Sequence, residues 1–307
     1  MELIRCGLNS KVNLLDPLVI TIGEFDGVHY AHSLLIKKVV EKAKEKKFKS
    51  AVMTFSPHPA YVLGKRQENG YITTLEQKKD IIEKLGVDYL IVVEFTIELS
   101  KLSYQDFEKE IIDMFNVQSI ICGFDFKYGY KGYGNYETLK EKYDTIYFDK
   151  IVMDEHKVSS TLIRKNLEEG NVEEANKLLK RPFSLRGKVI KGNNVGSKIG
   201  LATANLFFDD EFYFLKPGVY STYVNIDGLR YIGVCNIGHN PTFNYVQNLS
   251  VEVHILDFDK SIYNEMIEIE FMHFIREEVK FNSVDELLNR IDKDIKITKE
   301  LLWKQLV

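Results

Sequence analysis

The stretch from Ile20 to His32 reads ITIGEFDGVHYAH, and it predicts how the first half of the chain is organised. An apolar run, Leu18 to Ile22, leads into Gly23 and Gly27, and a helical pattern opens directly after them. The expected order is strand, glycine turn and helix start. A helix N-terminus offers unpaired N–H groups and partial positive charge, which favour phosphate oxygens. The stretch is therefore a candidate anion site.

His29 and His32 belong to the first helical turn, so we expect their side chains to share one face. As donors they would stabilise charge that grows on a leaving group. Two ordinary polar residues at a helix start are an alternative, and a metal pair is a weaker one. A metal would need a third ligand, for which His58 is the nearby candidate. The G-x-G-x-x-G and G-x-x-x-x-G-K-[ST] phosphate motifs do not occur in the sequence.

Length and composition are those of a two-domain globular protein. The chain has 307 residues, 45% hydrophobic and 28% charged, with a formal charge of −4. This balance argues against nucleic acid as a partner, and no apolar run approaches a membrane span. Cys6, Cys122 and Cys235 suggest neither a disulfide framework nor a zinc site. We expect a cytoplasmic protein, monomeric or weakly self-associating.

The two halves of the sequence differ in the spacing of their apolar residues. Up to residue 181, apolar strands alternate with helical patterns, which predicts an α/β domain with a parallel sheet. Thr73 with Glu76, or Thr74 with Gln77, forms a helix capping box. Residues 182–307 show period-two segments and an Asp227-Gly228 hairpin signal, which predict an antiparallel sheet or small barrel closed by a C-terminal helix.

Three further segments carry candidate chemistry. The loop from Gly123 to Gly134 is rich in glycine and aromatic residues, so it could stack on an isoalloxazine or adenine ring, or pack on its own domain. Thr203 and Asn205 supply oxygen ligands suited to Mg²⁺. Glu252 lies on the non-apolar face of an alternating strand, where it is a candidate base or an exposed glutamate.

The segment GEFDGVHYAH resembles the opening motif of the bacterial bifunctional riboflavin kinase and FAD synthetase family, among the H-x-G-H nucleotidylyltransferases. Ala31 stands where that family usually has glycine. The resemblance extends from Gly23 to the last helix. It implies an N-terminal Rossmann-like nucleotidylyltransferase domain with a parallel sheet, residues 1–181, and a C-terminal antiparallel β-barrel kinase domain with a terminal helix, residues 182–307.

The resemblance implies roles for residues of the first domain. His29, His32 and Arg164 would be catalytic in adenylylation. The ATP-binding set would be Gly23, Phe25, Asp26, Gly27, Ser160 and Thr161. The flavin-binding set would be His58, from a T-F-S-P-H-P segment, with Asp125, Phe126 and Tyr128 from the glycine-rich loop.

In the second domain, GSKIGLATAN (residues 196–205) resembles the kinase segment G-R-x-L-G-F-P-T-A-N. Ser197 and Ala202 replace its arginine and proline, and Lys198 is a substitute for the missing charge. The resemblance assigns ATP to Gly196, Lys198, Gly200, Thr203 and Asn205, Mg²⁺ to Thr203 and Asn205, and the general base to Glu252.

The implied function is phosphorylation of riboflavin to FMN and adenylylation of FMN to FAD, with ATP, riboflavin and FMN as substrates and Mg²⁺ as cofactor. One alternative is a monofunctional FAD synthetase with an inactive or merely flavin-binding second domain. Others are a flavin sensor without turnover, and a nucleotidylyltransferase for another acceptor.

Overall fold

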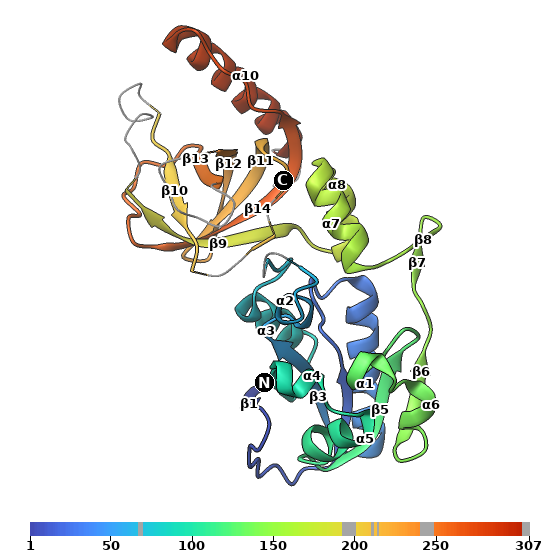
Figure 1. Cartoon of the computed structure of the whole chain (residues 1–307). Helices are drawn as coiled ribbons and strands as arrows, with labels where there is room; N and C mark the ends of the chain where they lie inside the picture. The colour runs from blue at the N-terminus through green and yellow to red at the C-terminus, as the bar shows by residue number, and fades with distance from the viewer. Residues whose placement is uncertain (67–69, 192–200, 210–211, 214, 240–248, 303–307) are drawn as a thin grey trace. The chain divides into compact units, whose positions relative to one another are not determined.

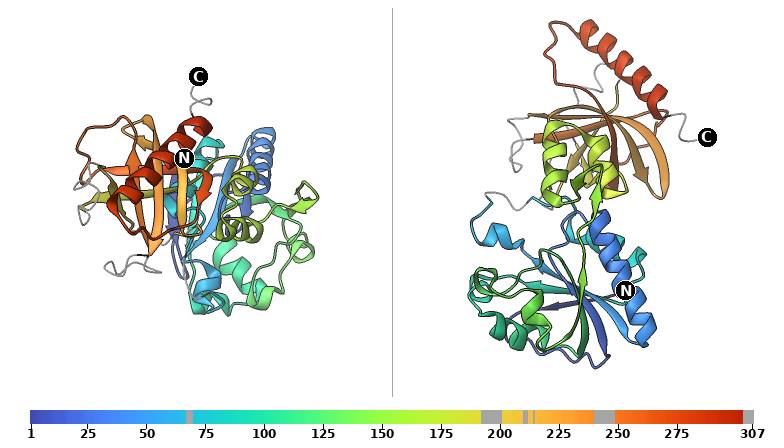
Figure 2. Two further views of the ribbon diagram at one scale, coloured as in Figure 1. Left: turned by 90° about the horizontal axis from the view of Figure 1, so that it is seen from above. Right: turned by 90° about the vertical axis from the view of Figure 1, so that its right-hand side faces the viewer.

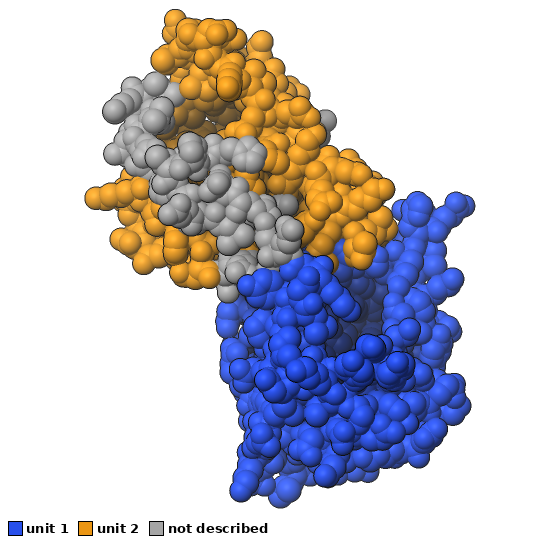
Figure 3. Space-filling model, in the orientation of Figure 1, with its two compact units in different colours: residues 1–160 blue, residues 161–307 orange. Residues whose placement is uncertain are grey.

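The computed structural model describes residues 1–307 except 67–69, 192–200, 210–211, 214, 240–248 and 303–307. Two compact units make up the chain, residues 1–160 and 161–307, and Figure 3 colours them separately. The predicted domain boundary after residue 181 falls inside the second unit and stays a prediction. All three cysteines are free and buried, as expected for reduced thiols.

The first unit is built on a six-stranded parallel sheet with the order β1-β4-β3-β2-β5-β6 (Figure 1). Its strands are β1 (Glu2–Cys6), β2 (Leu18–Ile22), β3 (Lys49–Ser56), β4 (Tyr89–Glu94), β5 (Val117–Gly123) and β6 (Asp144–Phe148). From β2 the chain winds outward to β3 and β4, and it then returns to β5 on the other side of β2. Open α/β sheets bind ligands beyond the carboxyl ends of their strands at such a reversal.

Helices cover both faces of this sheet (Figure 1 and Figure 2). On one face, α1 (Tyr30–Lys46) and α3 (Leu75–Lys84) pack onto residues such as Val19 and Val52. On the other, α4 (Ile97–Ser100), α5 (Tyr104–Phe107) and the π-helical turn Glu108–Ile112 pack onto Ile20 and Met53. β2 is buried on both faces, which explains why four of its five residues are apolar.

The remaining elements of the first unit are short. They are α2 (Pro59–Val62), the 3₁₀ turn Tyr130–Gly132, α6 (Tyr136–Leu139), and the paired strands β7 (Val152–Met153) and β8 (His156–Lys157).

The second unit is a closed antiparallel barrel with the order β10-β13-β12-β11-β14-β9. Its strands are β9 (Phe183–Ile190), β10 (Ala204–Phe207), β11 (Gly218–Ile226), β12 (Leu229–His239), β13 (Leu249–Ile255) and β14 (Met266–Arg276). In the part of this unit that the structure describes, it is accompanied by the helices α7 (Ser160–Glu169), α8 (Val172–Leu179) and α10 (Val284–Leu302). α8 packs on β14 and β9, and α10 packs on β11 and β12.

The predicted fold class is confirmed, with local corrections. The hairpin at Asp227-Gly228 is present, and both residues have positive φ. Of the two possible capping boxes at the start of α3, the structure has Thr74 with Gln77. The amphipathic pattern from residue 105 to 115 predicts one helix, and the structure has α5 followed by the π-helical turn there. β1 was not predicted.

The sequence predicts that Val284 belongs to an apolar stripe on the C-terminal helix and that Ser283 and Glu286 form its capping box. Val284 is instead 54% exposed, whereas Asp294 and Thr298 are buried. The Ser283 hydroxyl accepts from the Glu286 N–H, but the Glu286 carboxylate accepts from the Asn282 N–H and leaves the reciprocal half of the box unmade.

Candidate active sites

The two motif histidines stand together at the start of α1. His29 is the N-cap, and its Nδ1 accepts from the His32 N–H at 3.3 Å. The two rings stack, with centroids 3.5 Å apart and planes 16° apart. Because Nδ1 of His29 is an acceptor, its ring proton lies on Nε2 when the imidazole is neutral. Nε2 is then the donor that His29 can offer to an anion.

Burial keeps His32 neutral. Desolvation, the neighbouring His29 and the ammonium of Lys78 together hold the pKa of His32 well below its ordinary value of 6.5. A neutral imidazole donates through one N–H and carries no full charge. His32 is therefore suited to hydrogen bonding with an anion at neutral pH, and not to donating a proton as an imidazolium.

The loop between β2 and α1 is held by its own unit. The Asp26 carboxylate, 2% exposed, accepts from the N–H groups of Ile72 and Thr73 at 2.9 and 3.4 Å. The Ser160 hydroxyl donates to the Asp26 carbonyl at 2.8 Å. The described contacts of these two predicted ATP-binding residues are thus with backbone, and their roles toward ATP stay predictions.

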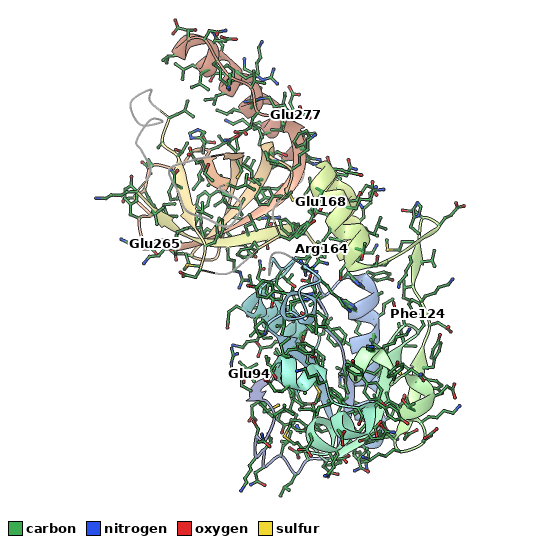
Figure 4. All side chains as sticks on the ribbon, viewed as in Figure 1. Glu94, Phe124, Arg164, Glu168, Glu265 and Glu277 are labelled. Atoms are coloured by element: carbon green, nitrogen blue, oxygen red, sulfur yellow. The ribbon has the colours of Figure 1, made fainter. Side chains whose placement is uncertain are left out.

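Thr161 and Arg164 belong to α7 in the second unit. Thr161 is exposed, and the Arg164 guanidinium carbon lies 5.3 Å from the centre of the Tyr213 ring. Figure 4 labels Arg164 and Glu168, one helical turn apart on α7. Their predicted roles in holding ATP are not tested by these contacts.

A cavity of about 820 Å³ lies at the carboxyl ends of the strands where the order reverses. Gly23 and Glu24 follow β2 on its wall, and residues 125–132 follow β5. We call it the β2–β5 cavity. Three of the predicted flavin residues, Asp125, Phe126 and Tyr128, line it. Its size and place are those expected of a site for a large aromatic substrate.

The aromatic loop partly packs on its own domain, as the alternative interpretation held. Tyr128 is 6% exposed, and its hydroxyl bonds to Glu108 and Thr138. Phe126 stacks on it with centroids 5.5 Å apart. Of this pair Phe126 is the more exposed, so it is the ring better placed to meet a ligand.

His58 is not among the described residues that line the β2–β5 cavity, although Pro59 is. It is the N-cap of α2, and its Nδ1 accepts from the Ala60 N–H at 3.1 Å. This contact gives His58 a structural task, and its role toward flavin stays a prediction.

In the barrel, strand register brings the candidate kinase residues into one row. Asn205 pairs with Glu252, Glu252 with Asn236, Asn236 with Val219, and Val219 with Arg276. A cavity of about 260 Å³, the Glu252 cavity, is lined by Glu252, Asn236 and Arg276, and by α10 residues including Leu287. Burial raises the pKa of Glu252 above its ordinary value of 4.5. A carboxylate with a raised pKa is a stronger base.

Thr203 connects the Glu252 cavity to a neighbouring one. It lines both this cavity and a second of about 260 Å³, whose wall includes residues 258–263. Gly196, Lys198 and Gly200, predicted to bind ATP, lie outside the described residues. Thr203 and Asn205 offer hard oxygen atoms beside the Glu252 carboxylate, a donor set that fits Mg²⁺. Among the described residues no group of three His, Cys, Asp or Glu could hold a metal.

Arg276 is fixed by a buried carboxylate on α10. Its Nε and Nη2 lie 2.9 and 2.8 Å from Oδ2 of Asp294, which is 1% exposed. Arg290 approaches the same carboxylate at 3.4 Å. Asp294 therefore joins α10 to the end of β14 at the wall of the Glu252 cavity.

We expect Asp294→Asn to lower the stability of the second unit by about 3 kcal/mol, because it leaves a largely buried arginine without its charge partner. Thermal unfolding measures the loss. Asp292→Asn, an exposed site on the same helix, is the matched control and should change stability by less than about 0.5 kcal/mol. Equal melting temperatures for the two variants would contradict this role of Asp294.

Family models match both halves of the chain. A family model described as FAD synthetase matches residues 12–166, and one described as riboflavin kinase matches residues 179–302. A bifunctional riboflavin kinase/FMN adenylyltransferase from Listeria monocytogenes is 40% identical over 93% of this chain and 93% of its own. The chain belongs to this bifunctional family. The resemblance inferred from the motifs is thereby confirmed.

A second relative carries the same name, and one solved structure shares the fold. The protein of the same name from Bacillus subtilis is 40% identical over 90% of each chain. A crystal structure named as a macrolide-efflux protein from Streptococcus pneumoniae superimposes with a TM-score of 0.90 and 31% identity, covering 97% of this chain and 98% of its own. In the described part of this chain, every helix is too short or too polar to cross a membrane.

Two buried charges in these sites were missed by the sequence analysis. Lys78 occupies the position between Leu75 and Ile82 on the inner face of α3, and Asp294 that between Ile291 and Thr298 on α10. The available signal was a charged residue at a core position of a helical stripe. Such residues are rarely buried unless they are paired.

Proposed function

We propose that the barrel carries the site for the first step of FAD synthesis and that the α/β sheet carries the site for the second. In the barrel, the 5′-hydroxyl of riboflavin attacks the γ-phosphorus of ATP, and Glu252 takes the hydroxyl proton, giving FMN and ADP. In the α/β unit, a phosphate oxygen of FMN attacks the α-phosphorus of a second ATP, giving FAD and pyrophosphate. The bifunctional family and both matched family models support this pair of reactions.

In adenylylation the stacked histidines are assigned to the departing pyrophosphate. His29 and His32 stand at the positive end of α1, where donors are favourably placed for the departing pyrophosphate. Gly23, Phe25, Asp26 and Gly27 shape the loop before them, while Ser160, Thr161 and Arg164 are assigned to ATP. The flavin of FMN is assigned to the β2–β5 cavity, with Phe126 as its stacking ring.

In phosphorylation two substrates must meet at one point. Thr203 lines both barrel cavities, so riboflavin in the Glu252 cavity and ATP in the neighbouring one would face each other there. Thr203 and Asn205 would hold Mg²⁺, which neutralises charge on the phosphates. Neither step requires a covalent enzyme intermediate, so alignment and charge stabilisation supply the rate enhancement.

One assay tests the proposal. Purified protein is incubated with riboflavin, ATP and Mg²⁺, and FMN and FAD are separated by chromatography. We expect both to form, with pyrophosphate released only in the second step. FAD from added FMN without FMN from riboflavin would favour a monofunctional enzyme, a reading that the matched kinase family model does not favour. Binding without turnover would favour a sensor.

A further inference from the structure

The loop between β2 and α1 has a strained backbone. Phe25 and Val28 have φ of +50° and +35°, although neither is glycine, and Gly27 has φ of +83°. Positive φ is unfavourable for a residue with a side chain, and most so for a β-branched one such as Val28. Such conformations persist only where the surrounding structure enforces them. The groups that hold this loop therefore determine the shape of the candidate phosphate site.

The side chain of Lys78 contacts the start of this loop. It projects from α3, is 1% exposed, and its ammonium donates to the Glu24 carbonyl at 2.6 Å and to the Thr54 hydroxyl at 3.1 Å. The Glu24 carboxylate lies 3.6 Å away. The Thr54 hydroxyl donates to the same Glu24 carbonyl at 2.9 Å. The ammonium and the hydroxyl thus fix one carbonyl at the start of the loop.

The segment before α3 holds the other end of the same loop. The Gly27 N–H donates to the Thr73 hydroxyl at 3.1 Å, and the Asp26 carboxylate accepts from two N–H groups of that segment. A methyl group added at Gly27 would lie 3.3 Å from Ile72, so the approach is close. Residues 72–78 therefore hold the loop at Glu24, Asp26 and Gly27.

We propose that Lys78 is a positioning residue for adenylylation, which fixes the Glu24 carbonyl and so maintains the strained loop that presents the histidine pair to ATP. This inference rests on the adenylyltransferase function proposed for the first unit. Removing the ammonium also leaves Glu24 without its charge partner, so the stability of each variant is measured beside its activity.

The positive charge of Lys78 also affects the pKa of His32. Among the described residues, the charged or titratable groups that lower the pKa of His32, besides its burial, are His29 from the α1 cap and Lys78 from α3. Glu24 pairs with Lys78. The ammonium disfavours a second positive charge on His32. Removing it should raise the pKa of His32 toward 6.5, so the ring would begin to protonate at higher pH.

The test compares Lys78→Met with Lys84→Met, an exposed lysine on the same helix. In Lys78→Met we expect kcat for FAD formation from FMN to fall about 100-fold, the loss typical of a misplaced reacting group. Riboflavin phosphorylation should stay unchanged in both variants. NMR titration should show His32 protonating at higher pH in Lys78→Met only.

Unchanged adenylylation and an unchanged His32 titration in folded Lys78→Met would overturn the proposal. If that variant does not fold, Lys78→Gln, which keeps a donor, is judged by the same two measurements. If even the unaltered chain makes no FAD, the proposed function has failed. The His32 titration would then still report whether Lys78 acts on the histidine pair.

Discussion

Glu252→Gln is expected to slow phosphorylation of riboflavin by about 100- to 10,000-fold, the range that a general base contributes, and to leave the conversion of FMN to FAD unchanged. Glutamine keeps the shape of the side chain and removes the proton acceptor. Glu252 is half-buried, faces a cavity, and has neighbours on both flanking strands that would keep a glutamine in place.

The measurement is the rate of FMN formation, with FAD formation from added FMN as an internal control in the same sample. Glu265→Gln, an exposed glutamate of the barrel that Figure 4 labels, is the matched control and should keep both activities. A Glu252→Gln variant that phosphorylates riboflavin at the original rate would rule out the base role.

The pH dependence follows from the same residue. Because burial raises the pKa of Glu252, the base is protonated at a pH where an exposed glutamate would still be ionised. Phosphorylation should therefore decline, as pH falls, at a value above the ordinary 4.5, whereas adenylylation should not share this decline. Rate profiles for both steps against pH test this difference.

The sequence predicted the elements whose patterns are local. The apolar run Leu18–Ile22, the glycines after it and the period-two strands each follow from neighbouring residues, and the structure has them. β1 was not predicted, because its sequence, ELIRC, mixes polar and apolar residues at the edge of the sheet. Only its pairing with β4, distant in sequence, makes it a strand.

The candidate sites were predictable only in part, for a related reason. A motif gives the residues that face a ligand, but not the residues that support them from behind. Lys78 and Asp294 act across elements distant in sequence, and each looks like a surface charge until its partner is known. The row from Asn205 to Arg276 likewise depends on the register of five strands. Spacing along the chain does not fix that register.

His29→Ala is expected to lower kcat for FAD formation by about 100- to 1,000-fold, as does the loss of one donor to a developing negative charge in other enzymes. Phosphorylation of riboflavin should be largely retained, because it is assigned to the other unit. The two rates are measured on one preparation. His156→Ala, an exposed histidine of the first unit, should change neither.

His29→Ala also removes the N-cap of α1, which lowers the free energy of unfolding by about 1 kcal/mol. His29→Asn separates the two losses, because asparagine can accept the His32 N–H as a cap but has no imidazole. If His29 acts on pyrophosphate, His29→Asn should regain stability and remain slow in adenylylation. Recovery of the rate with asparagine would mean that the imidazole serves only to begin α1. Equal loss of both activities in folded His29→Ala would refute the division of the two reactions between the units.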